Sequence, residues 1–249
     1  MAKSNGILKI EGTIEDLTFY KQDGQHYVRR KGGVSKERIA GDPNYVRTRE
    51  NNSEFGHCGN ASRLLRLALG SMVARAKDSK LHSRLVQTLS RIKNLDTQSP
   101  RGQRMVGNGL DTPMGKQMLR GFDFNIHAPL QTVLEASYVV DATIGKLTFA
   151  DLIPMDQVNF PEGATHFSLQ TAFSVVDFGT GQSAIGYSPI ENLPLNNQPT
   201  SLGLIVNNLP TGSGIRFFVL MISFFQEVNG VQYSLKNEGY NVLNVLEVL

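Results

Sequence analysis

The spacing of apolar residues changes twice along the chain and divides it into three regions. Near the N-terminus, apolar and polar residues alternate in ILKIEG and IEDLTFYK, and Asp23-Gly24 separates these runs from QHYVRRK. Alternation predicts strands, and an Asp-Gly pair between two strand-like runs predicts a hairpin, because both turn positions favour positive φ. We therefore expect an N-terminal β-hairpin.

From Asp42 onward the spacing becomes helical. Asp42 is a typical N-cap and Pro43 a typical first residue for a helix through YVRTRENNSEF. Asn60 or Ser62 can begin a second helix, and Ser79 a third. Their apolar residues recur every three or four positions, which predicts one buried stripe on each helix: Leu65, Leu69, Met72 and Ala76 on the second, and Leu81, Leu85, Leu89 and Ile92 on the third. The stretch QSPRGQRMVGNGLDTPMGKQML is rich in turn formers and predicts only a short helix near its end.

The remainder of the chain is typical of strands separated by Gly, Pro, Asn and Asp. The strand-like runs are LQTVLEASYVV, GKLTFADLI, ATHFSLQTAFSVVDF, TSLGLIVNNL, IRFFVLMISFFQEV, VQYSL and YNVLNVLEVL. This number of strands over ~120 residues favours an antiparallel sandwich, plausibly immunoglobulin-like. The predicted fold class is therefore α+β, with an N-terminal β-hairpin, a basic helical middle region and a C-terminal antiparallel β-sandwich. We place the domains at residues 1–125 and 126–249.

The run FFVLMISFF, from Phe217 to Phe225, is the most apolar part of the chain and does not alternate. Asn229-Gly230 predicts a tight turn that pairs it with Val231–Leu235. A strand that is apolar on both sides must be covered on both faces. One cover is the opposite sheet, and the other is either the helical region of the same chain or a neighbouring molecule. The run is too short to span a membrane, which takes about 20 residues.

Composition indicates a folded protein with an uneven distribution of charge. Hydrophobic residues make up 40% of the chain and charged residues 19%, which excludes global disorder. Residues 1–125 hold 22 Lys and Arg against 12 Asp and Glu, a net charge of +10, whereas residues 126–249 hold 3 against 10, a net charge of −7. The opening MAKSNGILKIEG lacks the apolar stretch of a signal peptide. We expect a cytoplasmic protein and leave export without a cleaved signal open.

Candidate catalytic and metal motifs fail on spacing. His57 and Cys58 are adjacent, but sequence neighbours seldom point at one another, so we interpret Cys58 as a small, partly buried residue at a helix entrance. The five histidines are scattered without a zinc-site spacing. GNGLDTPMGKQ lacks the first glycine of a phosphate loop, and GQSAIG is one residue too long for a nucleophile elbow. We predict no catalytic, cofactor-binding or metal-binding residue, and no enzyme.

Two segments carry a resemblance to known proteins. FQEVNGVQYSLKN near the C-terminus and GTIEDLTFYKQDGQHYVRRKGG near the N-terminus resemble an uncharacterised family of bacterial proteins, mostly from the Bacteroidota. The resemblance extends over nearly the whole chain. It implies a bacterial origin and no assigned activity.

The favoured functional hypothesis is a structural protein that self-associates into an ordered homo-oligomer or filament. Apolar strands would supply most of the affinity, and the oppositely charged halves would orient neighbouring copies head to tail. The candidate contacts are Ile7, Ile10, Leu17, Phe19, Tyr20, Phe217, Phe218, Phe224 and Phe225, with Arg29, Arg30 and Lys31 facing Asp151, Asp156 or Asp177 of a neighbour.

The alternative hypothesis is a nucleic-acid-associated protein. Residues 29–104 contain 17 Lys and Arg against 6 Asp and Glu, and Lys80, Arg84 and Arg91 lie beside the apolar stripe of the third predicted helix. Positive charge is sufficient for phosphate contacts. However, residues 77–93 contain no aromatic side chain on which a base could stack. This hypothesis is therefore the weaker of the two.

Overall fold

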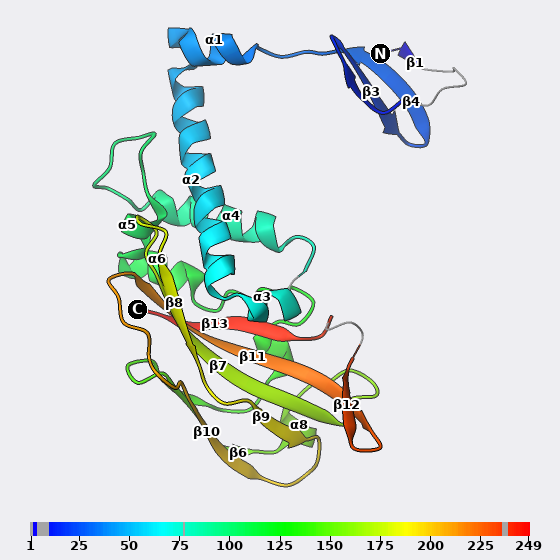
Figure 1. Ribbon diagram of the computed structural model, residues 1–249, viewed down its shortest axis with the longest axis vertical. Helices are drawn as coiled ribbons and strands as arrows, with labels where there is room; N and C mark the ends of the chain where they lie inside the picture. Colours follow the sequence, from blue (N-terminus) through cyan, green and yellow to red (C-terminus); the bar gives the residue numbers. More distant parts are fainter. Residues whose placement is uncertain (1, 4–9, 77, 236–238) are drawn as a thin grey trace. The chain divides into compact units, whose positions relative to one another are not determined.

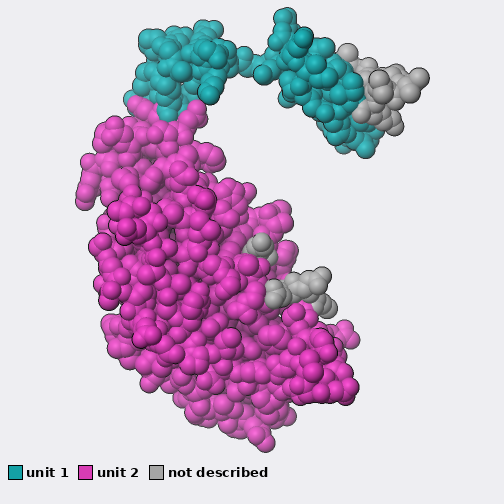
Figure 2. Space-filling model, viewed as in Figure 1, with its two compact units in different colours: residues 1–49 teal, residues 50–249 magenta. Residues whose placement is uncertain are grey.

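The computed structural model of the chain describes residues 2–3, 10–76, 78–235 and 239–249. These residues form two compact units, Met1–Arg49 and Glu50–Leu249 (Figure 1, Figure 2). The change of charge between residues 125 and 126 falls inside the second unit.

The first unit contains a small antiparallel sheet with the strand order β1-β4-β3-β2. Its strands are β1 (Ala2–Lys3), β2 (Gly12–Ile14), β3 (Leu17–Gln22) and β4 (Gln25–Arg30), followed by α1 (Lys36–Gly41) and the 3-10 helix η1 (Pro43–Tyr45). The predicted hairpin is confirmed between β3 and β4, with Asp23 at φ 50° and Gly24 at φ 78°. Ile10 precedes β2, so it lies outside the strand predicted for it, and Ile7 lies outside the described residues.

A layer of helices opens the second unit. Its members are α2 (Val46–Ala68), α3 (Ser71–Arg75), α4 (Leu81–Lys93), α5 (Val106–Leu110) and α6 (Pro113–Leu119). The eight predicted members of the two apolar stripes are all buried, which confirms their burial. The second predicted helix is divided between α2 and α3, because Leu69 and Gly70 lie outside both helices. The predicted helix start at Asn60 or Ser62 is wrong, because α2 continues through both residues. Cys58, Ala61 and Leu65 form one unbroken buried face, and this packing outweighs the capping preference of two polar residues.

Two antiparallel sheets follow, which confirms the α+β class. The larger sheet has the order β12-β11-β7-β8, with β13 also pairing β11 and β9 also pairing β7. Its strands are β7 (His166–Val176), β8 (Ser183–Tyr187), β9 (Glu191–Pro194), β11 (Ile215–Val228), β12 (Val231–Ser234) and β13 (Val242–Val248). The smaller sheet has the order β10-β6-β5, formed by β10 (Thr200–Ile205), β6 (Lys146–Leu152) and β5 (Val139–Asp141).

The connections correct one predicted strand. LQTVLEASYVV begins as the short helix α7 (Leu130–Val133) and contributes only its end to β5. Pro129 precedes this helical turn with φ −65°, an angle that suits a helix start as well as a strand. A second short helix, α8 (Pro154–Gln157), follows β6. The immunoglobulin-like arrangement stays a prediction.

The central strand β11 is buried on both of its faces by its own chain (Figure 1). Phe217, Val219 and Met221 belong to the core that the larger sheet shares with the helices. Phe218, Leu220, Ile222 and Phe224 belong to the core between the two sheets. The helical region is therefore the second cover that the apolar pattern requires. Phe217, Phe218 and Phe224 are at most 2% exposed, so the prediction that they contact a neighbouring copy is wrong.

One buried hydroxyl in β7 predicts a stability change. Thr171 is 0% exposed, and its Oγ1 has no hydrogen-bond partner among the described residues. Thr171→Val should leave the free energy of unfolding unchanged or raise it by about 1 kcal/mol, because an unpaired buried hydroxyl is replaced by a methyl group. Urea denaturation monitored by circular dichroism measures the difference.

Ser174 in the same strand is the matched control, since its Oγ donates to the carbonyl of Ala184 at 3.2 Å. Ser174→Ala should lower the free energy of unfolding by about 1 kcal/mol. Equal losses in the two variants would contradict the assignment of Thr171 as unpaired.

Candidate functional site

The N-terminal sheet has one strongly apolar face. Residues directly opposite each other in antiparallel strands project from the same side, and the register pairs Ile14 with Leu17 and Phe19 with Val28. We call these four residues the apolar face. Ile14 is 53% and Leu17 44% exposed, and none of the described residues between 10 and 49 is buried. The described part of the first unit therefore has no hydrophobic core of its own.

The register also separates the predicted basic contacts. Arg30 is opposite Leu17 and lies on the apolar side, where its Nη2 is 3.7 Å from Asp16 Oδ2 in a largely exposed ion pair. Arg29 lies on the other side, with its guanidinium 5.3 Å from the centre of the Tyr20 ring. The Tyr20 and Tyr27 rings stack there at 5.7 Å. Of the predicted contacts, Leu17, Phe19 and Arg30 thus share one surface, whereas Tyr20 and Arg29 do not belong to it.

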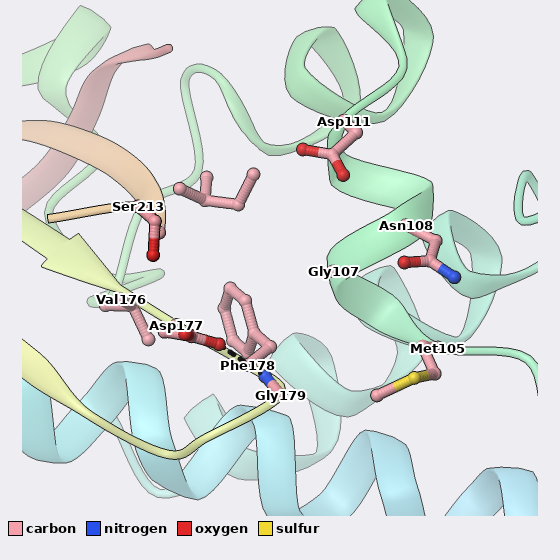
Figure 3. Close-up of a pocket in the computed structure, with 11 residues that line it drawn as sticks. Met105, Gly107, Asn108, Asp111, Val176, Asp177, Phe178, Gly179 and Ser213 are labelled. Carbon is pink, nitrogen blue, oxygen red and sulfur yellow. Dashed lines mark hydrogen bonds between the residues drawn. The ribbon is translucent and has the colours of Figure 1, made fainter.

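An acidic pocket lies in the second unit (Figure 3). Its volume is about 250 Å³. It is bounded by α5 and its flanks, by the turn after β7, and by the residues that begin β11; the lining includes Met105, Asn108, Asp111, Asp177, Phe178 and Ser213. The Phe178 ring projects between these segments and packs edge-on against Phe217 at 6.3 Å. The pocket therefore combines an apolar floor with two carboxylates.

Asp177 is held as an anion by the turn that follows it. Its Oδ1 accepts hydrogen bonds from the backbone N–H groups of Thr180 at 3.0 Å and Gly179 at 2.8 Å. These bonds and the Thr180 side chain lower the pKa of Asp177 from its ordinary value. With Asp111 across the pocket, the site suits a ligand that has an apolar stem and a cationic end, such as an arginine or lysine side chain.

A buried carboxylate fixes the loop that leads into α5. Asp96 is 4% exposed and accepts hydrogen bonds from the backbone of Gln98, Ser99 and Met105 and from Asn108 Nδ2. Burial acts to raise the pKa of Asp96, but these hydrogen bonds outweigh it and lower the pKa to about 2. Asp96 therefore positions two residues of the pocket lining.

Glu54 of α2 binds the same loop from the opposite side. Its carboxylate is 1% exposed and accepts two hydrogen bonds from Arg104, at 2.8 and 2.9 Å, one from Gly102 N at 2.8 Å and one from Lys93. Burial acts to raise the pKa of Glu54, but these donors outweigh it and lower the pKa to about 2. His57, one turn later on α2, accepts from Val106 N through Nε2 at 3.0 Å. Burial lowers the pKa of His57, which favours this neutral acceptor.

Two glycines show what role the segment GNGLDTPMG, which superficially resembles a phosphate loop, has in packing. A Cβ at Gly109 would collide with the carbonyl group of Ile92, and a Cβ at Gly115 would collide with the carbonyl group of Gly109. The glycines thus allow α4, α5 and α6 to approach closely, which gives GNGLDTPMG a packing role.

The predicted nucleic-acid contacts do not form one surface. Arg84 pairs with Asp78, donates to the carbonyl oxygens of Asp123 at 2.9 Å and Phe124 at 3.1 Å, and lies 5.2 Å from the Phe122 ring centre. This arginine ties α4 to the segment beside β13, so its prediction as a phosphate contact is wrong. Lys80 and Arg91 are exposed at the two ends of α4.

The remaining predicted residues lie apart. Asp151 and Asp156 are exposed on β6 and α8, outside the acidic pocket, and Lys31 is exposed after β4. Phe225 is half-buried and lines a separate cavity. Asp111 was missed because no spacing distinguishes it within a turn-rich segment. Cys58 is fully buried and not partly buried as predicted, and it lies inside α2 and not at a helix entrance. Burial raises the pKa of its thiol.

Comparisons with known proteins identify no relative of this chain. No protein-family model, curated protein or solved structure matches the chain. The resemblance to the Bacteroidota family stays a prediction. Within the described ranges, the structure contains no cluster of three or more His, Cys, Asp or Glu suited to a metal ion. No helix among those residues has the length and apolar character needed to cross a bilayer.

The carboxylates of the α5 loop predict how stability depends on pH. Because Glu54 and Asp96 have lowered pKa values in the folded state, the unfolded chain binds protons first as the pH falls. Their contribution should be complete above about pH 4.5 and disappear as the pH approaches about 2. Urea denaturation at a series of pH values measures this loss.

Glu54→Gln should flatten the acid limb of that profile and lower stability at neutral pH by about 3 kcal/mol or more, because Lys93 and Arg104 lose their buried partner. Glu162→Gln is the control, since Glu162 is exposed. A Glu54→Gln profile parallel to that of the unmodified protein would contradict the assignment.

The contacts of Arg84 predict that two arginines of α4 contribute differently to the free energy of unfolding. Arg84→Met should lower the free energy of unfolding by about 3 kcal/mol, because Asp78, whose side chain is 1% exposed, loses its ion pair. Arg91→Met should change it by less than about 0.5 kcal/mol, because Arg91 is exposed. Denaturation of both variants measures the difference, and a stable Arg84→Met variant would restore Arg84 as a candidate phosphate contact.

Proposed function

We propose that this protein is a non-enzymatic structural protein that self-associates head to tail. The apolar face of the N-terminal sheet is the donor surface, and the acidic pocket of another copy is the acceptor. Arg30 enters the pocket beside Asp111 and Asp177, while Leu17 and Phe19 pack at its apolar edge. A heterologous contact of this kind generates rings or filaments according to whether the rotation closes.

The observation that carries the proposal is the apolar face itself. A sheet of this size needs a covered apolar side to be stable, yet no described residue between 10 and 49 is buried. Exposed apolar surface on a small sheet typically marks an interaction site. A partner that covers Ile14, Leu17, Phe19 and Val28 would supply the missing layer.

Charge complementarity supports a second copy as that partner. Arg30 lies on the apolar side of the sheet. Lys21 and His26 are opposite each other in β3 and β4 and lie on the same side, at the other end of the strands. The acceptor pocket holds Asp111 and Asp177 over the Phe178 floor. Its volume of about 250 Å³ accommodates one large side chain. Opposite charge sets the orientation, and apolar burial supplies the affinity.

A pair of variants in β3 tests the donor surface. Leu17→Asp should weaken association at least about tenfold, because a carboxylate on the apolar face cannot be buried without a large desolvation cost. Thr18→Asp introduces the same group at the next position but on the opposite face, and it should leave association nearly unchanged. Sedimentation velocity across a wide concentration range measures both. Equal effects of the two variants, or a monomeric unmodified protein at every concentration, would reject the proposal.

Mixing two charge-reversed variants tests the head-to-tail arrangement. Arg30→Asp removes the donor charge, and Asp111→Arg removes the acceptor charge, so each variant alone should be monomeric. Their mixture retains one intact donor and one intact acceptor, and the two reversed charges are complementary to each other, so the mixture should associate again at least to dimers. Light scattering coupled to size-exclusion chromatography reads the masses. A mixture that remains monomeric would falsify the pairing.

Asp151→Arg is the matched acceptor control, because Asp151 is an exposed carboxylate of the second unit that lies outside the pocket. It should associate like the unmodified protein. Loss of association in Asp151→Arg but not in Asp111→Arg would move the acceptor surface to β6 and overturn the assignment of the pocket.

A further inference from the structure

A second, smaller cavity lies on the helix-facing side of the larger sheet. Its volume is about 40 Å³, and its lining includes Arg75 of α3, Ser168 and Gln170 of β7, and Met221 and Ser223 of β11. The strand register pairs Gln170 with Met221 and Ser168 with Ser223, so these four side chains form two adjacent rows on one face. Arg75 reaches this face from α3, because its Nη2 lies 3.2 Å from Met221 Sδ.

Arg75 differs from two other half-buried arginines of the helical layer, Arg84 and Arg104. Arg84 pairs with Asp78 and Arg104 pairs with Glu54, whereas no ion pair among the described residues includes Arg75. Its one hydrogen-bond acceptor in that part of the chain is a thioether sulfur, which accepts weakly. A guanidinium carries five N–H donors in a planar fork that matches a carboxylate. The cavity thus contains a cation with unused donors.

The other polar groups are oriented by their neighbours. Ser168 Oγ donates to Asn192 Oδ1 at 3.2 Å, and Gln170 Nε2 donates to the carbonyl of Ser188 at 3.2 Å. Ser223 is 5% exposed, and its hydroxyl group adds a neutral donor close to the guanidinium. A planar oxyanion bound to Arg75 can accept from this hydroxyl as well.

The size of the cavity limits the anion. A water molecule needs on the order of 10–15 Å³ of such space, so about three water-sized groups fit. A carboxylate group has three heavy atoms, whereas phosphate and sulfate have five. The cavity therefore favours a carboxylate over a tetrahedral anion.

We propose that this cavity is a carboxylate-binding site in which the Arg75 guanidinium holds both oxygens of the ligand and the Ser223 hydroxyl donates to one of them. The ligand is a small organic acid or the terminal carboxylate of a peptide. The site is independent of the proposed self-association, because it shares no residue with the apolar face or with the acidic pocket.

Thermal denaturation of the full chain with added sodium acetate tests the site. Acetate should raise Tm in a saturable way beyond the effect of sodium chloride at the same ionic strength. Sodium phosphate should produce no saturable rise. Two versions of one acetylated dipeptide, with a free C-terminal carboxylate and with a C-terminal amide, distinguish a peptide terminus from a free acid. Tighter binding of the acid form than of acetate assigns a peptide, and equal or weaker binding assigns a small acid.

Three variants connect the binding to the cavity. Arg75→Met should weaken acetate binding at least about tenfold, because it removes the charged hydrogen bonds. Arg63→Met, at an exposed arginine of α2, should bind acetate like the unmodified protein. Ser223→Ala should fold normally and weaken binding severalfold, which keeps the test open if Arg75→Met fails to fold. Equal acetate responses in the unmodified protein, Arg75→Met and Ser223→Ala, or an acetate response no larger than that of chloride, would overturn the proposal.

Discussion

The burial of β11 on both faces is the constraint on which the second unit depends. Phe217, Val219 and Met221 require an apolar layer on one side, and Phe218, Leu220 and Ile222 require another on the opposite side. The helices supply the first layer and the three-stranded sheet supplies the second (Figure 1). Because both layers come from the same chain, the most apolar segment of the sequence is an internal feature of the fold and is not available to a partner.

Buried carboxylates organise the helical layer around this core. Glu54 and Asp96 hold the loop before α5 from two sides, and both keep their negative charge because several donors compensate for burial. The loop carries Met105 and Asn108 to the acidic pocket. The same network uses Lys93 and Arg104, and Arg84 has a similar role at the other end of α4. Three basic side chains of the basic half of the sequence, Arg84, Lys93 and Arg104, therefore neutralise buried carboxylates.

The first unit has the opposite character. Its sheet presents Ile14, Leu17, Phe19 and Val28 on one side and stacked tyrosines on the other, and none of residues 10–49 is buried. In the second unit, the strongly apolar runs of the helices and of β11 are buried in its two hydrophobic cores. The proposal of self-association therefore rests on the N-terminal sheet and not on β11. The acidic pocket suits a cationic ligand, whereas the cavity beside Arg75 suits a carboxylate.

The sequence by itself determined those features that depend on neighbouring residues. Asp23-Gly24 and Asn229-Gly230 specify tight turns through their own φ angles, and the leucine spacing of α4 specifies its buried face. The same reasoning could not tell whether Arg84 faces solvent or the carbonyl groups of Asp123 and Phe124, because these partners meet only after α4 packs beside that segment. It also could not bring Asp111 to Asp177 or Arg75 to Ser223, which are distant in sequence. Only the tertiary structure decided these contacts, since long-range packing sets which charges are neutralised and which remain available to a ligand.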